Sequence, residues 1–409
     1  MRREARDSGG AGKHASRLTP HPSPRFRVLP PLSVYIHIPW CVRKCPYCDF
    51  NSHEARGETP EQEYIAALTA DLEAALPLIW GRKIYTVFFG GGTPSVFSAA
   101  GIEQIIAMVR ARLPLSIEAE ITLEANPGTF EAEKFRGFRD AGVNRLSIGI
   151  QSFNAAHLQA LGRIHDDDQA RRAIDIAREN FANFNLDLMY GLPGQSVGEA
   201  GADIEAALAY APPHLSAYHL TLEPNTYFHR YPPKLPDDDS AAEMQQTVEA
   251  RLAAAGYRHY ETSAFAQPGS QSRHNMNYWT FGDYVGIGAG AHSKISFRDR
   301  ILRQARYKQP KQYMQSAISG NAVQETHDVG GDEVGFEFMM NALRLNGGFP
   351  LVLFEERAGV PLTAVLKQLE QAEQKGLITR DHQRVEPTVL GRRFLNDLLQ
   401  IFLGDDKVA

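Results

Sequence analysis

At 409 residues the chain is long enough to bury the core of a barrel-sized domain and that of a smaller one. Its composition, 43% hydrophobic and 22% charged, is ordinary for a globular protein, and a net charge of −5 excludes binding to nucleic acid or membranes through a strong positive field. No apolar run approaches the length of about 18 residues that a spanning helix needs, so we expect a protein that is not integral to the membrane.

The N-terminal segment, residues 1–32, is basic and contains several Gly, Pro and Ser residues. It has no apolar stretch of the kind found in secretory signals. We therefore predict a disordered leader over 1–32.

From residue 33 onward, short β-branched or apolar runs alternate with amphipathic stretches. The predicted strands are 33–38, 84–89, 120–123, 145–150, 185–189 and 214–220. The predicted helices are 60–75, 101–112, 131–141, 167–180 and 198–210. This alternation is typical of an α/β protein with a parallel sheet. Six units favour a partial (β/α)6 barrel over residues 33–256, with a doubly wound sheet as the alternative.

The rest of the chain differs in character. Residues 257–325 are aromatic and strand-like with several glycines, which predicts a strand-rich extension. Residues 326–409 predict a small C-terminal helical domain, with helices at 354–375 and 387–403 around the short segment LITRDHQRVEP. Two helices and a hairpin of this size are winged-helix-like.

Polar or glycine-rich clusters follow nearly every predicted strand. They read PWCVRKCPYC, GGGTPS, EANPGT, QSFN, DLMYGLPGQ and TLEPNT. In parallel α/β folds, ligand sites form at the carboxyl ends of the strands. These clusters therefore predict one large site on one rim.

The chain has three cysteines, Cys41, Cys45 and Cys48, all within eight residues. This odd, compact set argues against a disulfide framework and fits a reducing compartment, so we expect a cytoplasmic protein. Thiolates at this spacing can bind three irons of a cubane and leave the fourth open. The alternative is a zinc site with His37 or His53 as a fourth ligand, although zinc modules usually pair two Cys-x2-Cys knuckles.

Cys-x3-Cys-x2-Cys, with an aromatic residue before the last cysteine, stands beside three further motifs: YIHIPWC from Tyr35, GGGTP from Gly90 and DLMYGLP from Asp187. Together they resemble the radical-SAM family of anaerobic coproporphyrinogen oxidases, in particular its HemW-type branch of heme chaperones, over roughly residues 33–400. The resemblance implies a radical-SAM barrel and a [4Fe–4S] cluster held by the cysteines. It also implies S-adenosylmethionine (SAM) on the fourth iron, where reduction cleaves a carbon–sulfur bond.

The glycine run is expected to lie on the SAM side of the rim. Gly91, Gly92 and the adjoining Thr93 would let the backbone approach the methionine part of SAM, because the glycines carry no Cβ. The alternative is a tight turn. Glu124, at the end of the next strand, is implied by the resemblance as a further SAM contact. A carboxylate there could accept both ribose hydroxyls, as acidic residues do in dinucleotide folds, or it could be an N-terminal helix charge or a surface carboxylate.

Further SAM-site residues are implied by the resemblance alone. They are Tyr35 and the backbone of Tyr47 beside the cluster, with Gln151, Arg163 and Asp187 on the rim. Arg163 could instead be a solvated helix charge, and Asp187 could cap a helix or pair with a nearby cation. Thr221 and His292 match looser positions, where relatives contact a second SAM.

The motif His274-Asn-Met-Asn-Tyr-Trp279 resembles one associated with heme binding in the HemW-type branch. An imidazole can ligate heme iron, and Tyr278 and Trp279 offer flat apolar area. The alternative is a packed, hydrogen-bonded core histidine. The sequence differs from that of the oxidases in two places. The oxidases carry a further cysteine where this chain has Phe50, and they have an N-terminal extension where this chain has a leader containing Gly and Pro. Both differences argue against decarboxylation of coproporphyrinogen.

Three functional hypotheses follow. The first is a heme chaperone that binds SAM and heme and delivers heme to acceptor proteins, including membrane respiratory enzymes. The second is an oxygen-independent coproporphyrinogen III oxidase. The third, a radical-SAM enzyme acting on tRNA, lacks a basic stripe, so we expect no nucleic-acid partner.

Overall fold

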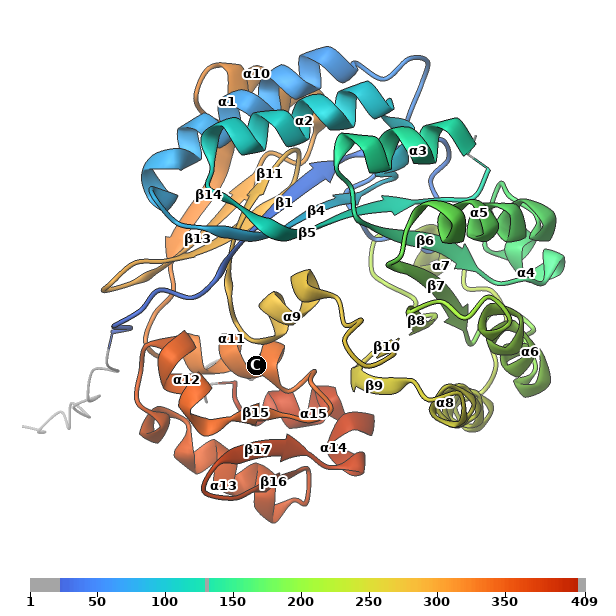
Figure 1. Ribbon diagram of the computed structural model, residues 1–409. Coiled ribbons are helices and arrows are strands. Elements are labelled where there is room, and N and C mark those ends of the chain that lie inside the picture. The colour runs from blue at the N-terminus through green and yellow to red at the C-terminus, as the bar shows by residue number, and fades with distance from the viewer. Residues whose placement is uncertain (1–22, 129–131, 404–409) are drawn as a thin grey trace, which may run out of the picture.

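The computed structural model describes residues 23–128 and 132–403, and its main body is a twelve-stranded sheet that curves into an open barrel (Figure 1). The six strands that alternate with helices are β1 (Leu32–Ile38), β4 (Ile84–Gly91), β5 (Leu115–Ala125), β6 (Arg145–Gln151), β7 (Phe184–Tyr190) and β8 (His214–His219). The helices between them are α1 (Glu61–Ile79), α2 (Ala99–Arg112), α3 (Ala132–Ala141), α4 (Ala155–Ala160), α5 (Asp167–Asn180) and α6 (Val197–Leu208). Every strand and helix predicted for this part of the chain is present.

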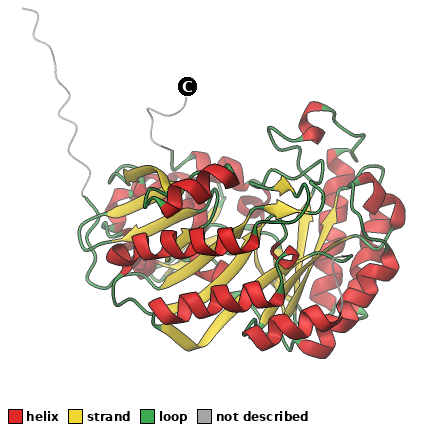
Figure 2. Cartoon of the chain, turned by 90° about the horizontal axis from the view of Figure 1, so that it is seen from above, coloured by secondary structure: helices red, strands yellow, loops and turns green. Residues whose placement is uncertain are grey.

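Strand order decides between the two predicted architectures. From β1 to β8 each of these strands pairs in parallel with the one before it, in chain order. A doubly wound sheet would instead reverse its direction of growth and cover both faces with helices. The connecting helices here lie along the outer side of the strands (Figures 1 and 2). The partial (β/α)6 barrel is therefore confirmed.

The inner face of the barrel is polar. Along β5 the apolar Ile121 and Leu123 belong to the core under the helices, so by alternation Glu120, Thr122 and Glu124 face inward. Hydrogen bonds between inward side chains cross neighbouring strands, as from Thr86 to Ser33, from Ser147 to Asp187 and from Ser216 to Asn185. Complete eightfold barrels fill this space with branched apolar side chains. A polar interior is instead suited to a ligand.

The predicted strand-rich extension joins both edges of the same sheet. Beyond β8 lie β10 (Ala264–Ala266) and β9 (Arg258–Glu261). At the other edge β11 (Asp283–Ile287) pairs in parallel with β1 and is a seventh parallel strand. The antiparallel strands β12 (His292–Ser296), β13 (Ile301–Arg306) and β14 (Val323–Asp328) complete that edge.

Between the two edge groups, α9 (Arg273–Trp279) is a short helix where strand-like backbone was predicted, so that prediction is wrong. The Ser272 hydroxyl caps the helix by accepting from the N–H of Asn275. The N–H groups of Arg273 and His274 donate to the inward carboxylate of Glu120 at 3.2 and 3.1 Å. Helix N-termini favour such carboxylates. The helix is thereby fixed inside the arc, against β1 and β4 (Figure 1).

The C-terminal domain has a core of its own. Its helices and strands are α11 (Val334–Ala342), β15 (Phe349–Pro350), α12 (Leu351–Ala358), α13 (Leu366–Gln374), β16 (Ile378–Arg380), β17 (Arg384–Pro387), α14 (Val389–Arg393) and α15 (Leu395–Gln400). Phe338, Phe349 and Phe354 pack edge to face at its centre. The hairpin β16–β17 coincides with the segment predicted between the helices, and β15 adds a third strand.

Both long helices predicted in this domain are broken. Over 354–375 the chain leaves α12 at Gly359, whose φ of 70° suits glycine, and Pro361 follows before α13 begins. Over 387–403 the chain forms α14 and α15, separated at Phe394. A hydrophobic period alone did not reveal these interruptions.

The prediction of a disordered leader over 1–32 is wrong for the last part of that segment. Residues 1–22 lie outside the described residues, but the following segment is packed. Phe26 is buried in the core of the C-terminal domain, and its N–H donates to the carbonyl of Arg298. The N–H of Arg25 donates to the carbonyl of Gly359. The segment before β1 therefore lies against the C-terminal domain.

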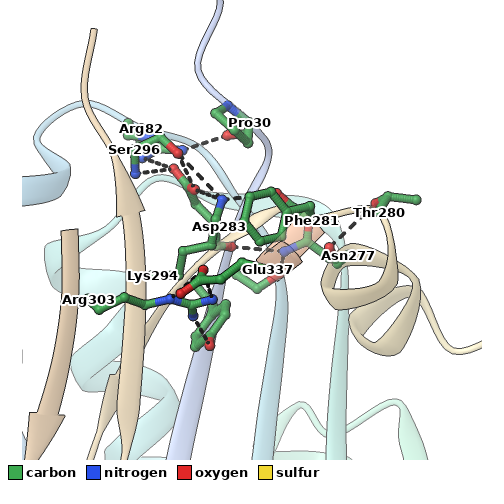
Figure 3. A network of polar contacts seen from close by, with 12 residues as sticks. Pro30, Arg82, Asn277, Thr280, Phe281, Asp283, Lys294, Ser296, Arg303 and Glu337 are labelled. Atoms are coloured by element: carbon green, nitrogen blue, oxygen red, sulfur yellow. Dashed lines mark hydrogen bonds and ion pairs between the residues drawn. The ribbon is translucent and has the colours of Figure 1, made fainter. Parts of the chain in front are cut away.

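A buried ionic network lies where β11, β12 and the barrel meet (Figure 3). Its centre is the fully buried carboxylate of Asp283, which pairs with Lys294 at 2.9 Å and with Arg82 at 2.8 Å. Nearby, Arg303 on β13 pairs with Glu337 on α11 at 2.6 Å. This second pair connects the barrel sheet to the C-terminal domain.

The remaining elements are short connections or outer helices: β2 (Trp40–Cys41), β3 (His53–Glu54), α7 (Tyr227–Arg230), α8 (Asp238–Ala254) and α10 (Pro310–Ile318). None of the helices in the described part of the chain combines the length and the apolar character that crossing a membrane requires.

Candidate cluster and cofactor site

All three cysteines lie on one loop above the carboxyl ends of the barrel strands. The loop leaves β1, and β2 pairs with β3 so that its two ends are held together. Cys41 is buried while Cys45 and Cys48 are partly exposed, and all three line the same cavity. This placement is the one predicted from the strand-end clusters.

Hydrogen bonds from the barrel fix the far end of this loop. The Tyr35 hydroxyl donates to Nδ1 of His37 at 3.1 Å, and Nε2 of His37 donates to the carbonyl of Asn51 at 2.9 Å. Nδ2 of Asn51 then donates to the carbonyls of Ala289 and Lys308, both at 2.9 Å. His37 and Asn51 therefore support the loop, and His37 is not free to complete a zinc site.

The described residues contain no group of three or more His, Cys, Asp and Glu side chains arranged around a single metal ion. This disfavours the zinc alternative, because all three cysteines are among these residues. The thiolates of a cubane bind separate irons and need not converge on one point. Three cysteines around one cavity therefore fit a [4Fe–4S] cluster.

The glycine run lies against the cysteine loop. A Cβ on Gly92 would come within 2.6 Å of the carbonyl oxygen of Trp40 and 3.0 Å of Sγ of Cys41. At Gly91, φ is 117° and a Cβ would be 2.7 Å from the His37 ring. The N–H of Thr93 donates to the carbonyl of Trp40 at 2.8 Å. These glycines permit close packing of strand and loop, and they also line the cysteine cavity.

Two carboxylates, those of Glu124 and Asp187, line the cysteine cavity. Burial and the nearby carboxylate of Asp187 raise the pKa of Glu124 to about 8, against the effect of a hydrogen bond from the Gly91 N–H. Burial also raises the pKa of Asp187, whose oxygens accept from Ser147 and Asn185 at 2.8 Å. Glu124 has fewer protein donors and is the carboxylate better placed to accept from a ligand.

Arg163 lies beside Cys45 and is not a solvated helix charge. Its Nη1 donates to Sγ of Cys45 at 3.5 Å, and its Nη2 donates to Asn126 at 2.5 Å and to the carbonyl of Gly149 at 2.8 Å. Its buried Nε has no partner among the described residues. The Tyr47 side chain is also close to Cys45 and Arg163.

Gln151 lines the same cavity with a left-handed backbone, at φ 69°. A non-glycine residue held there costs free energy and is found more often at functional sites than elsewhere. The sequence analysis missed Asn126, Met189 and Tyr218, which also line the cavity. Asn126 stands in the EANPGT cluster, and alternation along β7 and β8 could have indicated the other two.

The predicted heme ligand, His274, lies outside this cavity. It is 1% exposed, its Nδ1 lies 2.7 Å from the Thr86 hydroxyl, and its Nε2 lies 3.1 Å from the Tyr278 hydroxyl. Phe88 stacks on its ring. In this arrangement neither ring nitrogen is available to a heme iron, so direct ligation by His274 stays a prediction that requires a rearrangement.

A second cavity, of about 740 Å³, adjoins the first, and Cys48 and Phe50 line both. Its walls come from the cysteine loop, the end of α9, the face of β11–β13 and α11. Tyr35 lines this second cavity and not the first. Of the two looser positions, His292 lines it as well, whereas Thr221 lines neither cavity and donates to Glu223 at 2.7 Å.

Comparison with known proteins agrees with this geometry. The model of the radical SAM superfamily matches residues 35–207, and that of the HemN C-terminal domain matches residues 331–394. The heme chaperone HemW of Escherichia coli is 48% identical over 379 residues, covering 92% of this chain and 99% of the relative. HemW of Bacillus subtilis is 35% identical over 381 residues, covering 91% of this chain and 99% of the relative.

The chain belongs to the HemW family of radical-SAM proteins. A solved structure of coproporphyrinogen III oxidase from E. coli, described as a radical SAM enzyme, matches with a TM-score of 0.78 and 25% identity over 91% of this chain and 90% of that one. The radical-SAM barrel and the additional C-terminal domain are therefore confirmed. As a radical-SAM protein, this HemW family member carries a [4Fe–4S] cluster and SAM.

Proposed function

We propose that the chain is a heme chaperone, which binds heme beside its cluster site and transfers it to heme-protein acceptors. Membership of the HemW family supports this function. The structural observation that carries it is the 740 Å³ cavity beside Cys48, whose size is typical of sites for small molecules and cofactors. Aromatic and cationic side chains line this cavity, as the apolar plane and the acidic edge of heme require.

We further propose that the cluster is held by Cys41, Cys45 and Cys48. SAM would lie along Gly91, Gly92 and Thr93 on one side and Glu124, Gln151, Arg163 and Asp187 on the other. When bound, the cluster and SAM supply one-electron chemistry. The protein's own contribution is placement: the strand ends position the polar groups, and the His37–Asn51 hydrogen bonds fix the loop.

The acceptors we propose are heme proteins, including membrane respiratory enzymes, and the compartment is the cytoplasm, where the three thiols stay reduced. The net charge of −5 and the lack of a basic stripe in the sequence support a chaperone over a tRNA enzyme. Phe50, which stands where the oxidases carry a further cysteine and is 59% exposed, supports it over coproporphyrinogen oxidation.

The test uses the full-length chain with its cluster reconstituted anaerobically. We expect it to bind hemin in a defined complex and to pass the heme to an added apo heme protein, while showing no turnover of coproporphyrinogen III with SAM and a reductant. A preparation that retains its cluster but binds no heme would disprove the proposal. So would reproducible formation of protoporphyrinogen IX.

A further inference from the structure

The second cavity contains one histidine whose imidazole is free. Two histidines line its wall, His37 and His292, and His274 is not among the lining residues. Both ring nitrogens of His37 take part in hydrogen bonds, with Tyr35 and Asn51. His292 is exposed at the start of β12, and within the described chain neither of its ring nitrogens has a hydrogen-bond partner.

The tyrosines of the same wall are already engaged. The Tyr35 hydroxyl bonds to His37 at 3.1 Å, that of Tyr278 lies 3.1 Å from His274, and that of Tyr284 accepts from Arg303 at 2.7 Å. Cys48 belongs to the cluster loop. Among the lining side chains, His292 is therefore the one best suited to ligate a metal in the cavity.

Strand register places His292 on the same face of the sheet as the basic side chains of Lys294 and Arg303. In the β11–β13 sheet Lys294 pairs with Tyr284 and Arg303, and His292 lies two residues before Lys294, so these side chains share one face. Figure 3 shows how Lys294 and Arg303 are neutralised, by Asp283 and Glu337 respectively. They form the floor of the cavity and carry no unbalanced charge.

Two other lining cations have no carboxylate partner within residues 23–128 and 132–403. The Lys44 ammonium donates only to the carbonyls of Phe50 and Ser52, at 3.4 and 3.1 Å. The exposed Lys308 side chain makes no hydrogen bond or ion pair within the part of the chain that the structure describes. The only lining carboxylate among these residues is that of Asp49. The second cavity is thus suited to a ligand with acidic groups at its edge.

The remaining wall is aromatic and apolar. Tyr278 and Tyr284 meet edge to face with their centroids 4.6 Å apart, and Trp279 follows on α9. Phe50 is 59% exposed at the boundary with the cluster cavity. Flat aromatic area, a free imidazole and two unneutralised ammonium groups are the features that a metalloporphyrin dicarboxylate would use.

We propose that heme binds in this second cavity with His292 as its axial ligand, while Lys308 and Lys44 receive its propionates. This inference rests on the proposed function and adds the location and the ligand. His274 then has a positioning role, because its ring holds Tyr278 and α9 against Thr86. The cluster site and the heme site would meet at Cys48 and Phe50.

The experiment titrates ferric hemin into the reconstituted full-length protein and follows the Soret band and the EPR signal of bound heme. The variants are His292→Ala, His274→Ala and, as a matched control two strands away in the same sheet, His327→Ala. His327 is exposed on β14 and does not line the cavity. We expect His292→Ala to lose the histidine-ligated spectrum and to weaken hemin binding at least about tenfold. His274→Ala and His327→Ala should keep that spectrum.

Two further measurements separate ligation from folding. In His292→Gly, added imidazole should restore the spectrum, since it can occupy the space of the missing ring. Lys308→Glu should weaken binding of hemin but not of its dimethyl ester, which lacks the propionate charges. Iron and sulfide content, unchanged in all variants, reports that the cluster loop is intact.

The outcomes discriminate clearly. A wild-type protein that binds no hemin would overturn the function and the site together. A His292→Ala variant with wild-type spectrum and affinity, or loss of the histidine signature in His274→Ala alone, would overturn the site and leave the function standing.

Discussion

Gly92 shows how closely the barrel rim is built around the cysteine loop. Its N–H donates to the carbonyl of Ile38 at 2.8 Å, and its Cα faces the backbone of Trp40 and the sulfur of Cys41. A side chain at this position would enter the space of the loop. The residue therefore matters to the cluster through packing, in addition to the backbone approach to SAM expected from the sequence.

Gly92→Ala should lower the cluster content of reconstituted protein, because the new Cβ would lie 2.6 Å from the Trp40 carbonyl oxygen and push the loop away. Overpacking of this kind typically costs about 1–3 kcal/mol. Iron and sulfide analysis with the visible absorption of the cluster measures the effect. Gly198→Ala is the matched control, since a Cβ there meets nothing within 4 Å. Full cluster content in Gly92→Ala would contradict the packing argument.

At the scale of elements, Asp283 determines how β11 is attached to the barrel. Its carboxylate accepts hydrogen bonds from Lys294 and from the N–H and hydroxyl of Ser296, and it forms an ion pair with Arg82 (Figure 3). These groups come from β12 and from the loop before β4. Although burial acts in the opposite direction, Lys294, Arg82 and the Ser296 N–H hold the pKa of Asp283 below its ordinary value.

Asp283→Asn should therefore destabilise the protein by about 3–5 kcal/mol at neutral pH, because it leaves buried cations without their partner. A carboxyl with a lowered pKa in the folded state contributes stability above its ordinary pKa of 3.8, and that stability is lost as the pH falls. The difference between the wild type and the variant should thus shrink in acid. Urea unfolding at several pH values checks both points. The exposed Asp299→Asn should leave stability unchanged, and an equal loss there would refute the assignment.

Across the whole molecule, the pair between Arg303 and Glu337 joins the barrel sheet to the C-terminal domain. Two guanidinium nitrogens of Arg303 donate to one oxygen of Glu337, at 3.1 and 2.6 Å, and a third donates to Tyr284. Both side chains are mostly buried, so water screens the pair little. The C-terminal domain also closes the second cavity through Asn341 of α11.

Glu337→Gln should loosen this junction by about 1.5–3 kcal/mol, the usual contribution of hydrogen bonds to a charged group. We expect faster hydrogen exchange in α11 and faster release of bound hemin, with the cluster retained. Exchange monitored by mass spectrometry and stopped-flow heme release are the measurements. Glu370→Gln, at an exposed position of α13, is the control. Unchanged exchange in Glu337→Gln would show that other contacts hold the two domains together.

The sequence by itself determined the features that depend on neighbours along the chain. The alternation of strands and helices, the cysteine spacing and the polar strand ends predicted the barrel, its rim and the cluster loop. Period and motif spacing are local properties, and the carboxyl ends of parallel strands meet at one edge by necessity. Glu124, Gln151, Arg163 and Asp187, implied by resemblance, line the cysteine cavity together with Gly91, Gly92 and Thr93.

Only the tertiary structure decided what depends on distant contacts. It placed β11 beside β1, packed His274 against Thr86 inside the arc, and left His292 free in the second cavity. A short stretch of sequence around His274 or His292 does not include the distant strands that bury His274 and leave His292 exposed. Burial and pairing of such side chains are set by closure of the whole chain, and no local pattern contains that information.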